Sequence, residues 1–220
     1  MNSWQEITKD QEFCTLVAEA LSKAAIGIDP KRFLLQFYPL VEKLYSATPF
    51  PDIDSVLASI LGVAQVGLIP SPISEVSHVS LLKQKRSDGR IRCVVSITES
   101  GYMELISRNC KNATYGTVYE GDVFKVKTGK GGFLLHEHGS DEPITARRTP
   151  VLVYSAGDCN DELIAAILPA QDGAKSALAA LYRIVSGRGA NTQISSAREA
   201  AKPTAKRALL DDAEEQIVIF

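Results

Sequence analysis

The sequence lacks the features that would assign it to several common classes. No apolar run approaches the roughly 20 residues that a membrane-spanning helix needs. The N-terminus has no basic region followed by an apolar one, as a secretory signal would. A GxxxxGK[S/T] phosphate loop and a GxSxG nucleophile elbow are both missing. We therefore expect a cytoplasmic protein that neither enters a membrane nor uses ATP.

Cysteine is also scarce. The four cysteines, Cys14, Cys93, Cys110 and Cys159, are far apart and form no C-x-x-C pair. This spacing favours buried free thiols in a reducing compartment over disulfides or a zinc site.

The chain has the composition of a globular protein, and its charge is distributed unevenly along the sequence. Hydrophobic residues make up 45% of the 220-residue chain and charged residues 23%, so it can bury a full core. The net charge of −2 combines −4 in residues 1–82, +6 in residues 83–207 and −4 in the last thirteen residues. A basic middle with acidic flanks is typical of a polyanion-binding core.

The first third of the chain has helical periodicity. Apolar residues in 5–25 recur at helical spacing, and Asp29 before Pro30 marks the start of a second helix. A third helix begins at a cap of Asp54 or Ser55 and ends near Gly67.

The rest alternates between strands and helices. Strands at 76–85 and 90–98 flank the turn Ser87-Asp88-Gly89 and predict a hairpin, which a short helix at 101–109 follows. A second hairpin is expected around Gly157-Asp158. The fold class is therefore α+β: a helical N-terminal part, a central antiparallel sheet packed with helices, and a C-terminal helix with a short tail. The remaining predicted elements are strands at 113–120, 123–128, 133–136, 151–155 and 163–168, a turn at 120–122 and helices at 174–185 and 196–210.

Four segments carry a resemblance to a known family when they are taken in order. They are SVLASILGVAQVGL (55–68), LLKQKRSDGRIRCVV (81–95), GYMELISRN (101–109) and VYEGDVF (118–124). The series resembles the RecT family of phage-type single-strand annealing proteins over roughly residues 29–210. One departure is Glu99-Ser100, where the family usually has Tyr-Lys or Tyr-Arg.

The resemblance implies a function without covalent chemistry. A RecT-like protein binds single-stranded DNA and anneals complementary strands without ATP, as an oligomeric ring or filament in homologous recombination. It implies a partner 5'-3' exonuclease and a host single-strand-binding protein. No cofactor is required, and Mg²⁺ is expected only as a counterion of DNA. A non-annealing single-strand-binding protein is one alternative.

The candidate DNA-binding residues are cations in and around the predicted hairpin and the last helix. Lys83 and Lys85 share a strand face, as do Arg90 and Arg92 on the partner strand, and such a ribbon suits a phosphate backbone. A solvated hairpin tip without a ligand is the alternative. Lys202, Lys206 and Arg207 are similar to a K-T-x-x-R-R element of the family. The full set is Lys83, Lys85, Arg86, Arg90, Arg92, Arg108, Lys111, Lys125, Lys127, Lys202, Lys206 and Arg207.

Tyr102, Tyr119 and Phe124 are candidates for stacking on bases, with core packing as the alternative. His136 and His138 lie at a spacing of two, so that with Glu120 or Asp122 they suggest a metal-dependent nuclease. No further ligand appears at a recognisable spacing, so no catalytic residue and no metal site is predicted.

The expected organisation assigns a role to each segment. Residues 1–50 form an acidic helical segment for oligomerisation, and residues 51–185 form the annealing core. A linker (186–195) and a basic helix (196–210) follow. The acidic, apolar tail (211–220) either competes with DNA for its groove or adds a strand to the sheet.

Overall fold

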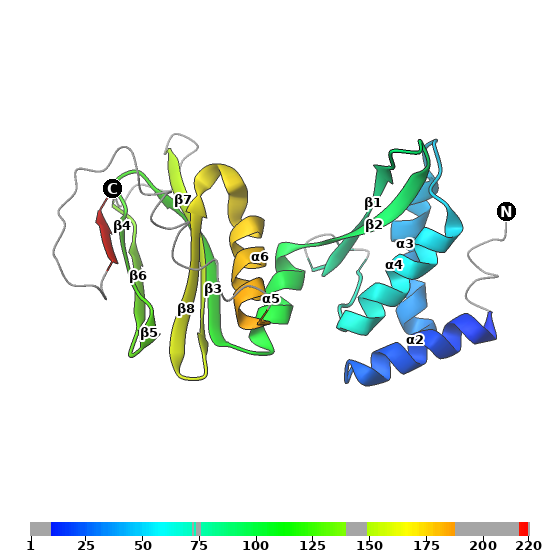
Figure 1. Cartoon of the computed structure of the whole chain (residues 1–220), viewed down its shortest axis with the longest axis horizontal. Helices are drawn as coiled ribbons and strands as arrows, with labels where there is room; N and C mark the ends of the chain where they lie inside the picture. The colour runs from blue at the N-terminus through cyan, green and yellow to red at the C-terminus, as the bar shows by residue number, and fades with distance from the viewer. Residues whose placement is uncertain (1–9, 72, 74–75, 140–148, 188–215, 220) are drawn as a thin grey trace. The chain divides into compact units, whose positions relative to one another are not determined.

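The computed structural model describes residues 10–71, 73, 76–139, 149–187 and 216–219, the last four by their backbone alone. The chain divides into two compact units, Met1–Glu104 and Leu105–Phe220 (Figure 1). Both contain helices and antiparallel strands, which confirms the predicted α+β class. The boundary expected near residue 50 lies inside the first unit.

Three helices of the first unit each begin directly after an aspartate. The carboxylates of Asp10, Asp29 and Asp52 accept hydrogen bonds from backbone N–H groups of the first turn, which would otherwise have no partner. The prediction from Asp29-Pro30 is confirmed. These helices are α2 (Gln11–Lys23), α3 (Pro30–Tyr45) and α4 (Ile53–Val66).

The cap of α4 corrects a prediction. Asp52, and not Asp54 or Ser55, is the N-cap, and its carboxylate accepts the Ser55 N–H at 2.8 Å. The Ser55 hydroxyl is used elsewhere, because it accepts the N–H of Cys93 at 2.8 Å. The helix ends as predicted at Gly67, which has the left-handed φ of 67°.

The core of the first unit is aromatic and aliphatic. Phe33 and Phe37 of α3 are fully buried, with their rings edge to face at 5.3 Å. The predicted hairpin is formed by β1 (Val79–Lys85) and β2 (Ile91–Ile97). Helix α3 contacts β1, α4 contacts β2, and α2 packs on both α3 and α4. The N-terminal helices are therefore part of the same unit as the hairpin.

Helix α5 (Glu99–Ser107) begins two residues before the predicted start. The reason is Thr98, whose hydroxyl accepts the Gly101 N–H at 3.1 Å and donates to the Ser77 carbonyl at 2.5 Å. Gly101 is buried, and a Cβ at this position would lie 2.1 Å from the carbonyl oxygen of His78. Only glycine lets the first turn of α5 approach the backbone so closely.

Gly101→Ala is therefore expected to destabilise the first unit by about 3 kcal/mol, because the backbone of His78 cannot move aside as a flexible side chain would. Thermal unfolding checks this, with a loss of roughly 10 °C expected. Gly62→Ala is the matched control: a Cβ there meets nothing within 4 Å, and alanine favours a helix interior. Equal melting temperatures for the two variants would contradict the close-contact explanation.

The second unit contains two antiparallel sheets and helix α6 (Gly173–Val185). One sheet has the order β3-β7-β8-β5, and the other has the order β6-β4-β9. In Figure 1, α6 lies beside the first sheet, and the Ser155 hydroxyl of β7 donates to the Ala177 carbonyl of α6 at 2.7 Å. A one-turn helix at Ala170–Asp172 precedes α6. The strands are β3 (Lys111–Tyr119), β4 (Val123–Lys127), β5 (Gly129–Lys130), β6 (Phe133–Glu137), β7 (Pro150–Cys159), β8 (Glu162–Pro169) and β9 (Gln216–Ile219).

The two sheets share an apolar core. Val118 of β3 and Leu152 and Tyr154 of β7 pack with Phe124 and Val126 of β4. Side chains alternate along a strand, so the residues between these face away from this core. Phe124 and Val126 point inward for this reason, while their neighbours in β4 lie on the outer face.

The strand connections of the second unit include one that was not predicted and one hairpin turn that differs from the prediction. The turn at 120–122 is present, but β3 and β4 belong to different sheets. The β7–β8 hairpin turns at Asn160-Asp161, and not at Gly157-Asp158, which lies within β7. Asn160 and Asp161 have φ values of 54° and 64°, the conformation that a two-residue hairpin loop requires.

The prediction of free thiols is wrong for two of the four cysteines. Cys110, before β3, and Cys159, at the end of β7, form a disulfide with their Cα atoms 4.3 Å apart. The pairing of Lys111 with Asp158 brings these cysteines together across 49 residues of sequence. Cys93 is a buried thiol, as predicted, whereas Cys14 is a thiol that is only half-buried.

Candidate nucleic-acid interface

The β1–β2 hairpin is a fixed ribbon whose tip is closed by local hydrogen bonds. The Arg86 N–H donates to the Arg90 carbonyl at 2.8 Å, and the Gly89 N–H donates to the Arg86 carbonyl at 3.1 Å. The Asp88 carboxylate accepts the Arg90 N–H at 3.0 Å. Gly89 has a φ of 84°, so the Asp-Gly pair supplies the turn that the sequence predicted.

The register places the two pairs of cations on opposite faces of the ribbon. Lys83 is paired with Cys93, and Lys85 with Ile91, so both lysines are on the face that carries the buried Cys93. Arg92 is paired with Gln84 and therefore lies on the other face. Each pair shares a face of its own strand, as predicted.

Lys83 is engaged within its own unit. Its ammonium donates to the carbonyl of Ala47, after α3, and lies 5.9 Å from the centre of the Phe50 ring. Both contacts tie β1 to the segment that joins α3 to α4. In this structure Lys83 holds the hairpin in place and does not present its charge at the tip.

Four cations remain exposed at the end of the hairpin: Lys85, Arg86, Arg90 and Arg92. We call these four residues the basic tip. Asp88 is the only acid in residues 83–92, all of which are described, and its carboxylate is turned to the Arg90 backbone. Arg92 donates from Nε and Nη2 to the Gln84 side-chain oxygen at 2.8 and 2.5 Å, which orients its guanidinium. The tip therefore carries an excess of three positive charges.

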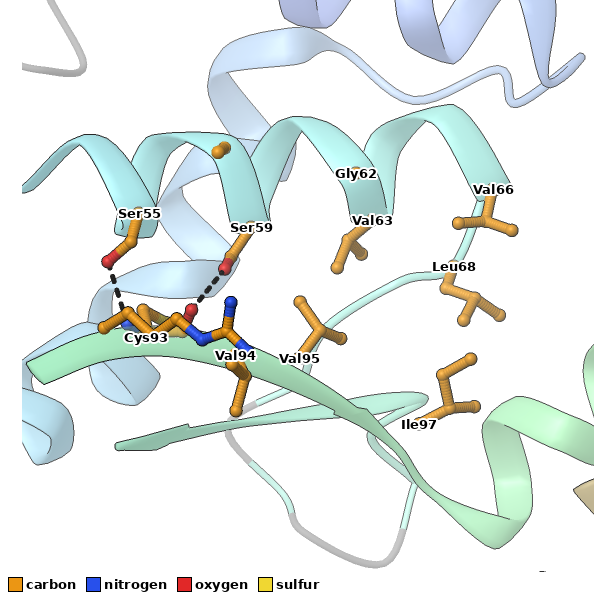
Figure 2. A pocket seen from close by; sticks show the side chains of 12 residues that line it. Ser55, Ser59, Gly62, Val63, Val66, Leu68, Cys93, Val94, Val95 and Ile97 are labelled. Carbon is orange, nitrogen blue, oxygen red and sulfur yellow. Dashed lines mark hydrogen bonds between the residues drawn. The ribbon is translucent and has the colours of Figure 1, made fainter. Parts of the chain in front are cut away.

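Helix α4 positions the ribbon through the backbone of β2. The Ser55 hydroxyl accepts the Cys93 N–H, and the Ser59 hydroxyl donates to the Cys93 carbonyl at 3.4 Å (Figure 2). The Asp52 N–H donates to the Ile91 carbonyl at 3.1 Å. These bonds satisfy part of the outer edge of β2, which would otherwise be open to another strand.

A groove of about 540 Å³ lies between α4 and β2, and we call it the α4 groove (Figure 2). Its wall is mainly apolar, and Arg92 of the basic tip also lines it. This groove was not predicted from the sequence. The signal was a row of small residues at helical spacing on α4, Ser55, Ser59 and Gly62, which leaves room beside the strand.

Cys93 in the wall of this groove is not an activated nucleophile. Burial is the largest effect and raises the pKa of the Cys93 thiol; a hydrogen bond with the Ser59 side chain lowers it, and the nearby Asp52 carboxylate raises it by less. The thiol is therefore protonated at neutral pH.

The other described cations of the predicted set belong to the second unit. Arg108 and Lys111 are exposed near the junction of α5 and β3. Lys125 and Lys127 share the outer face of β4, as predicted, and are half-buried. They are paired with Leu135 and Phe133 of β6, so that face combines cations with an aromatic ring that is 40% exposed. Lys202, Lys206 and Arg207 lie outside the described residues.

Among the predicted stacking residues, Phe124 is excluded. It is fully buried between the sheets, with its ring centroid 5.0 Å from that of Tyr154. Tyr102 and Tyr119 are half-buried. Phe133, which was not predicted, and Tyr115, 38% exposed, are the more accessible rings in the described part of this unit.

Asp122, His136 and His138 come together at one end of β4 and β6, although no metal site was predicted there. His136 Nε2 lies 2.9 Å from Asp122 Oδ2, and His138 Nδ1 lies 3.5 Å from the same oxygen. Glu120, the other acid considered, is not in this cluster.

The chain matches no protein-family model and no curated protein. No helix in the described residues is long and apolar enough to cross a membrane.

Proposed function

We propose that this protein binds single-stranded DNA through the basic tip and anneals complementary strands without ATP or covalent chemistry. The observation that carries the proposal is the excess of three positive charges at the exposed end of a hairpin that is hydrogen-bonded to α4. A cationic surface of this kind would bind a polyanion. The ordered series of segments similar to RecT proteins supports single-stranded DNA as that polyanion.

The physical basis is neutralisation of charge. Two DNA strands repel each other, and cations that bind phosphates release counterions and lower that repulsion. Contacts to phosphates carry no sequence information, so binding is independent of sequence and the base edges stay available for pairing. Annealing needs no more than this.

An assay with complementary oligonucleotides, one carrying a fluorophore and the other a quencher, separates this proposal from its alternatives. Acceleration of pairing in EDTA and without ATP supports annealing. Tight binding without acceleration would indicate a protein that only protects single strands. Shortened strands on a denaturing gel, formed only with metal, would indicate a nuclease.

Assembly into a ring or filament is part of the proposal, and the outer surface of the N-terminal helices supports it. Leu16 of α2 and Leu35 and Tyr38 of α3 are 45%, 62% and 44% exposed, although their neighbours are in the core. An apolar surface on helices of a DNA-binding unit suits a second copy of the chain, and a head-to-tail contact extends into rings or filaments.

Leu35→Glu with Tyr38→Glu is expected to shift the protein to smaller species, because the two carboxylates would have to be buried in the contact between copies. Light scattering coupled to size exclusion measures the change. Lys43→Glu, at an exposed position of the same helix, is the control and should keep the wild-type size. If the double variant keeps the wild-type size, α3 is not part of the contact between copies.

The cellular setting follows from the proposed activity. A protein that anneals strands in recombination acts in the cytoplasm on single strands that a 5'-3' exonuclease has exposed, and it meets the host single-strand-binding protein there. Mg²⁺ enters this account only as a counterion of DNA.

A further inference from the structure

The cluster at the end of β4 and β6 combines ligand types that metal ions prefer. Asp122 lies in the turn that precedes β4 and is fully buried. His136 is in β6 with 11% of its side chain exposed, and His138 follows that strand with 47% exposed. One ligand atom from each lies within 4.8 Å of the other two. Two imidazoles and a carboxylate form one of the common ligand sets for zinc.

The spacing suits a tetrahedral ion. Bonds of about 2.0–2.2 Å place the ligand atoms around such an ion roughly 3.3–3.6 Å apart. The Asp122–His138 distance of 3.5 Å falls in that range, and the Asp122–His136 distance of 2.9 Å is somewhat shorter. The ligand atoms of His136 and His138 lie within 4.8 Å of each other, and the exposure of His138 leaves a fourth position open to water.

Neighbouring residues hold the side chains of Asp122 and His136 in place through hydrogen bonds. His136 Nδ1 lies 3.3 Å from the hydroxyl of Tyr154, a contact that accommodates the Nδ1–H tautomer, in which the Nε2 lone pair points toward Asp122 and could bind a metal ion. The Gly139 N–H donates to Asp122 Oδ1 at 3.1 Å, and the Tyr119 N–H donates to Oδ2 at 3.0 Å. A Cβ on Gly139 would lie 1.6 Å from the Gly121 carbonyl oxygen, so glycine is required where the chain passes Asp122.

We propose that Asp122, His136 and His138 form a binding site for one zinc-class divalent ion, with the fourth position open to water. Imidazole ligands select zinc, cobalt or nickel over magnesium and calcium, which prefer oxygen. The ion would join the turn before β4 to the end of β6 and stabilise the second unit. The site is distinct from the basic tip and does not depend on the proposed annealing activity.

Cobalt(II) tests the site directly, because its visible absorption reports the ligands and their geometry. The full chain, made without a polyhistidine tag and stripped of metal, is titrated with Co²⁺ and then with Zn²⁺ as a competitor. One ion per chain and a tetrahedral spectrum that Zn²⁺ displaces are expected. Zn²⁺ should also raise the melting temperature by several degrees.

Two substitutions make the test specific. His138→Ala removes a half-exposed ligand with little risk to folding, and it should weaken binding about 100-fold or more and abolish the thermal shift. His78→Ala is the control, since His78 is the remaining histidine of the three and accepts the Ile69 N–H in the first unit. Equal metal binding by wild type and His138→Ala would overturn the proposal, as would the absence of stoichiometric binding by wild type. The contact between Asp122 and His136 would then be a hydrogen bond that only stabilises the fold.

Discussion

Reversing three charges of the basic tip should reduce the affinity for single-stranded DNA about 1000-fold at moderate salt. The variant is Lys85→Glu, Arg90→Glu and Arg92→Glu, and each site is exposed. Each lost phosphate contact removes one released counterion and each new carboxylate adds repulsion, so both effects act in one direction. The slope of log affinity against log salt should fall by about two, since single strands give about 0.7 per contact. Fluorescence polarisation with a labelled oligonucleotide measures both.

A matched control separates the tip from net charge. Lys31→Glu, Arg32→Glu and Lys43→Glu change the charge of the same unit by the same amount at exposed positions of α3. This control should lose affinity by less than about tenfold, because it leaves the basic tip unchanged and adds only repulsion that salt screens. If both triple variants lose affinity equally, the tip has no specific role. If neither does, the hairpin is a solvated tip without a ligand.

Removing residues 216–220 should destabilise the second unit. Strand β9 is paired with β4 from Val123 to Val126, so its loss opens the edge of a strand whose Phe124 and Val126 are in the core. The loss of several ladder hydrogen bonds is expected to cost about 2 kcal/mol and roughly 10 °C in melting temperature. Thermal unfolding followed by circular dichroism measures it.

A second variant separates the strand from the charge of the tail. Changing Asp211, Asp212, Glu214 and Glu215 to their amides keeps the strand and removes four negative charges. We expect an unchanged melting temperature for it. The pairing of β9 with β4 favours the strand over a tail that competes with DNA. If both variants bind DNA more tightly and their melting temperatures are unchanged, the tail competes with DNA and is not a strand of the sheet.

The parts of the fold that the sequence predicted well are those with local causes. Asp29-Pro30 starts α3 because both groups act within one helical turn. The β1–β2 hairpin forms where Asp88 and Gly89 supply the turn. Helix α6 follows from its apolar periodicity, and it begins within one residue of the predicted position.

The parts that were missed depend on contacts between distant segments. Nothing near Tyr119 or Val123 indicates that β3 and β4 join different sheets, since that choice depends on β7 and β6. The Cys110–Cys159 disulfide likewise depends on the register of β3 with β7. The Asn160-Asp161 turn was a missed local signal, because asparagine and aspartate tolerate positive φ.

The candidate site shows the same division. The sequence identified the cations of the tip, but the ribbon register decided that Lys83 faces the helical part and Arg92 faces outward. Phe124 looked suitable for stacking on bases, and its inward position follows only from the packing of the two sheets. Asp122 was already a candidate partner for the two histidines, but their meeting needed the pairing of β4 with β6.

The most direct test of the central claim is the initial rate of annealing of two complementary oligonucleotides in EDTA without ATP. Wild type and the α3 triple variant should accelerate pairing over the protein-free reaction, and the basic-tip triple variant should not. The three proteins must have equal melting temperatures and equal sizes in light scattering for the comparison to hold, because the control lies on the helix whose outer surface is proposed to join copies of the chain. Undiminished acceleration by the tip variant, or none by wild type, would contradict annealing through the basic tip.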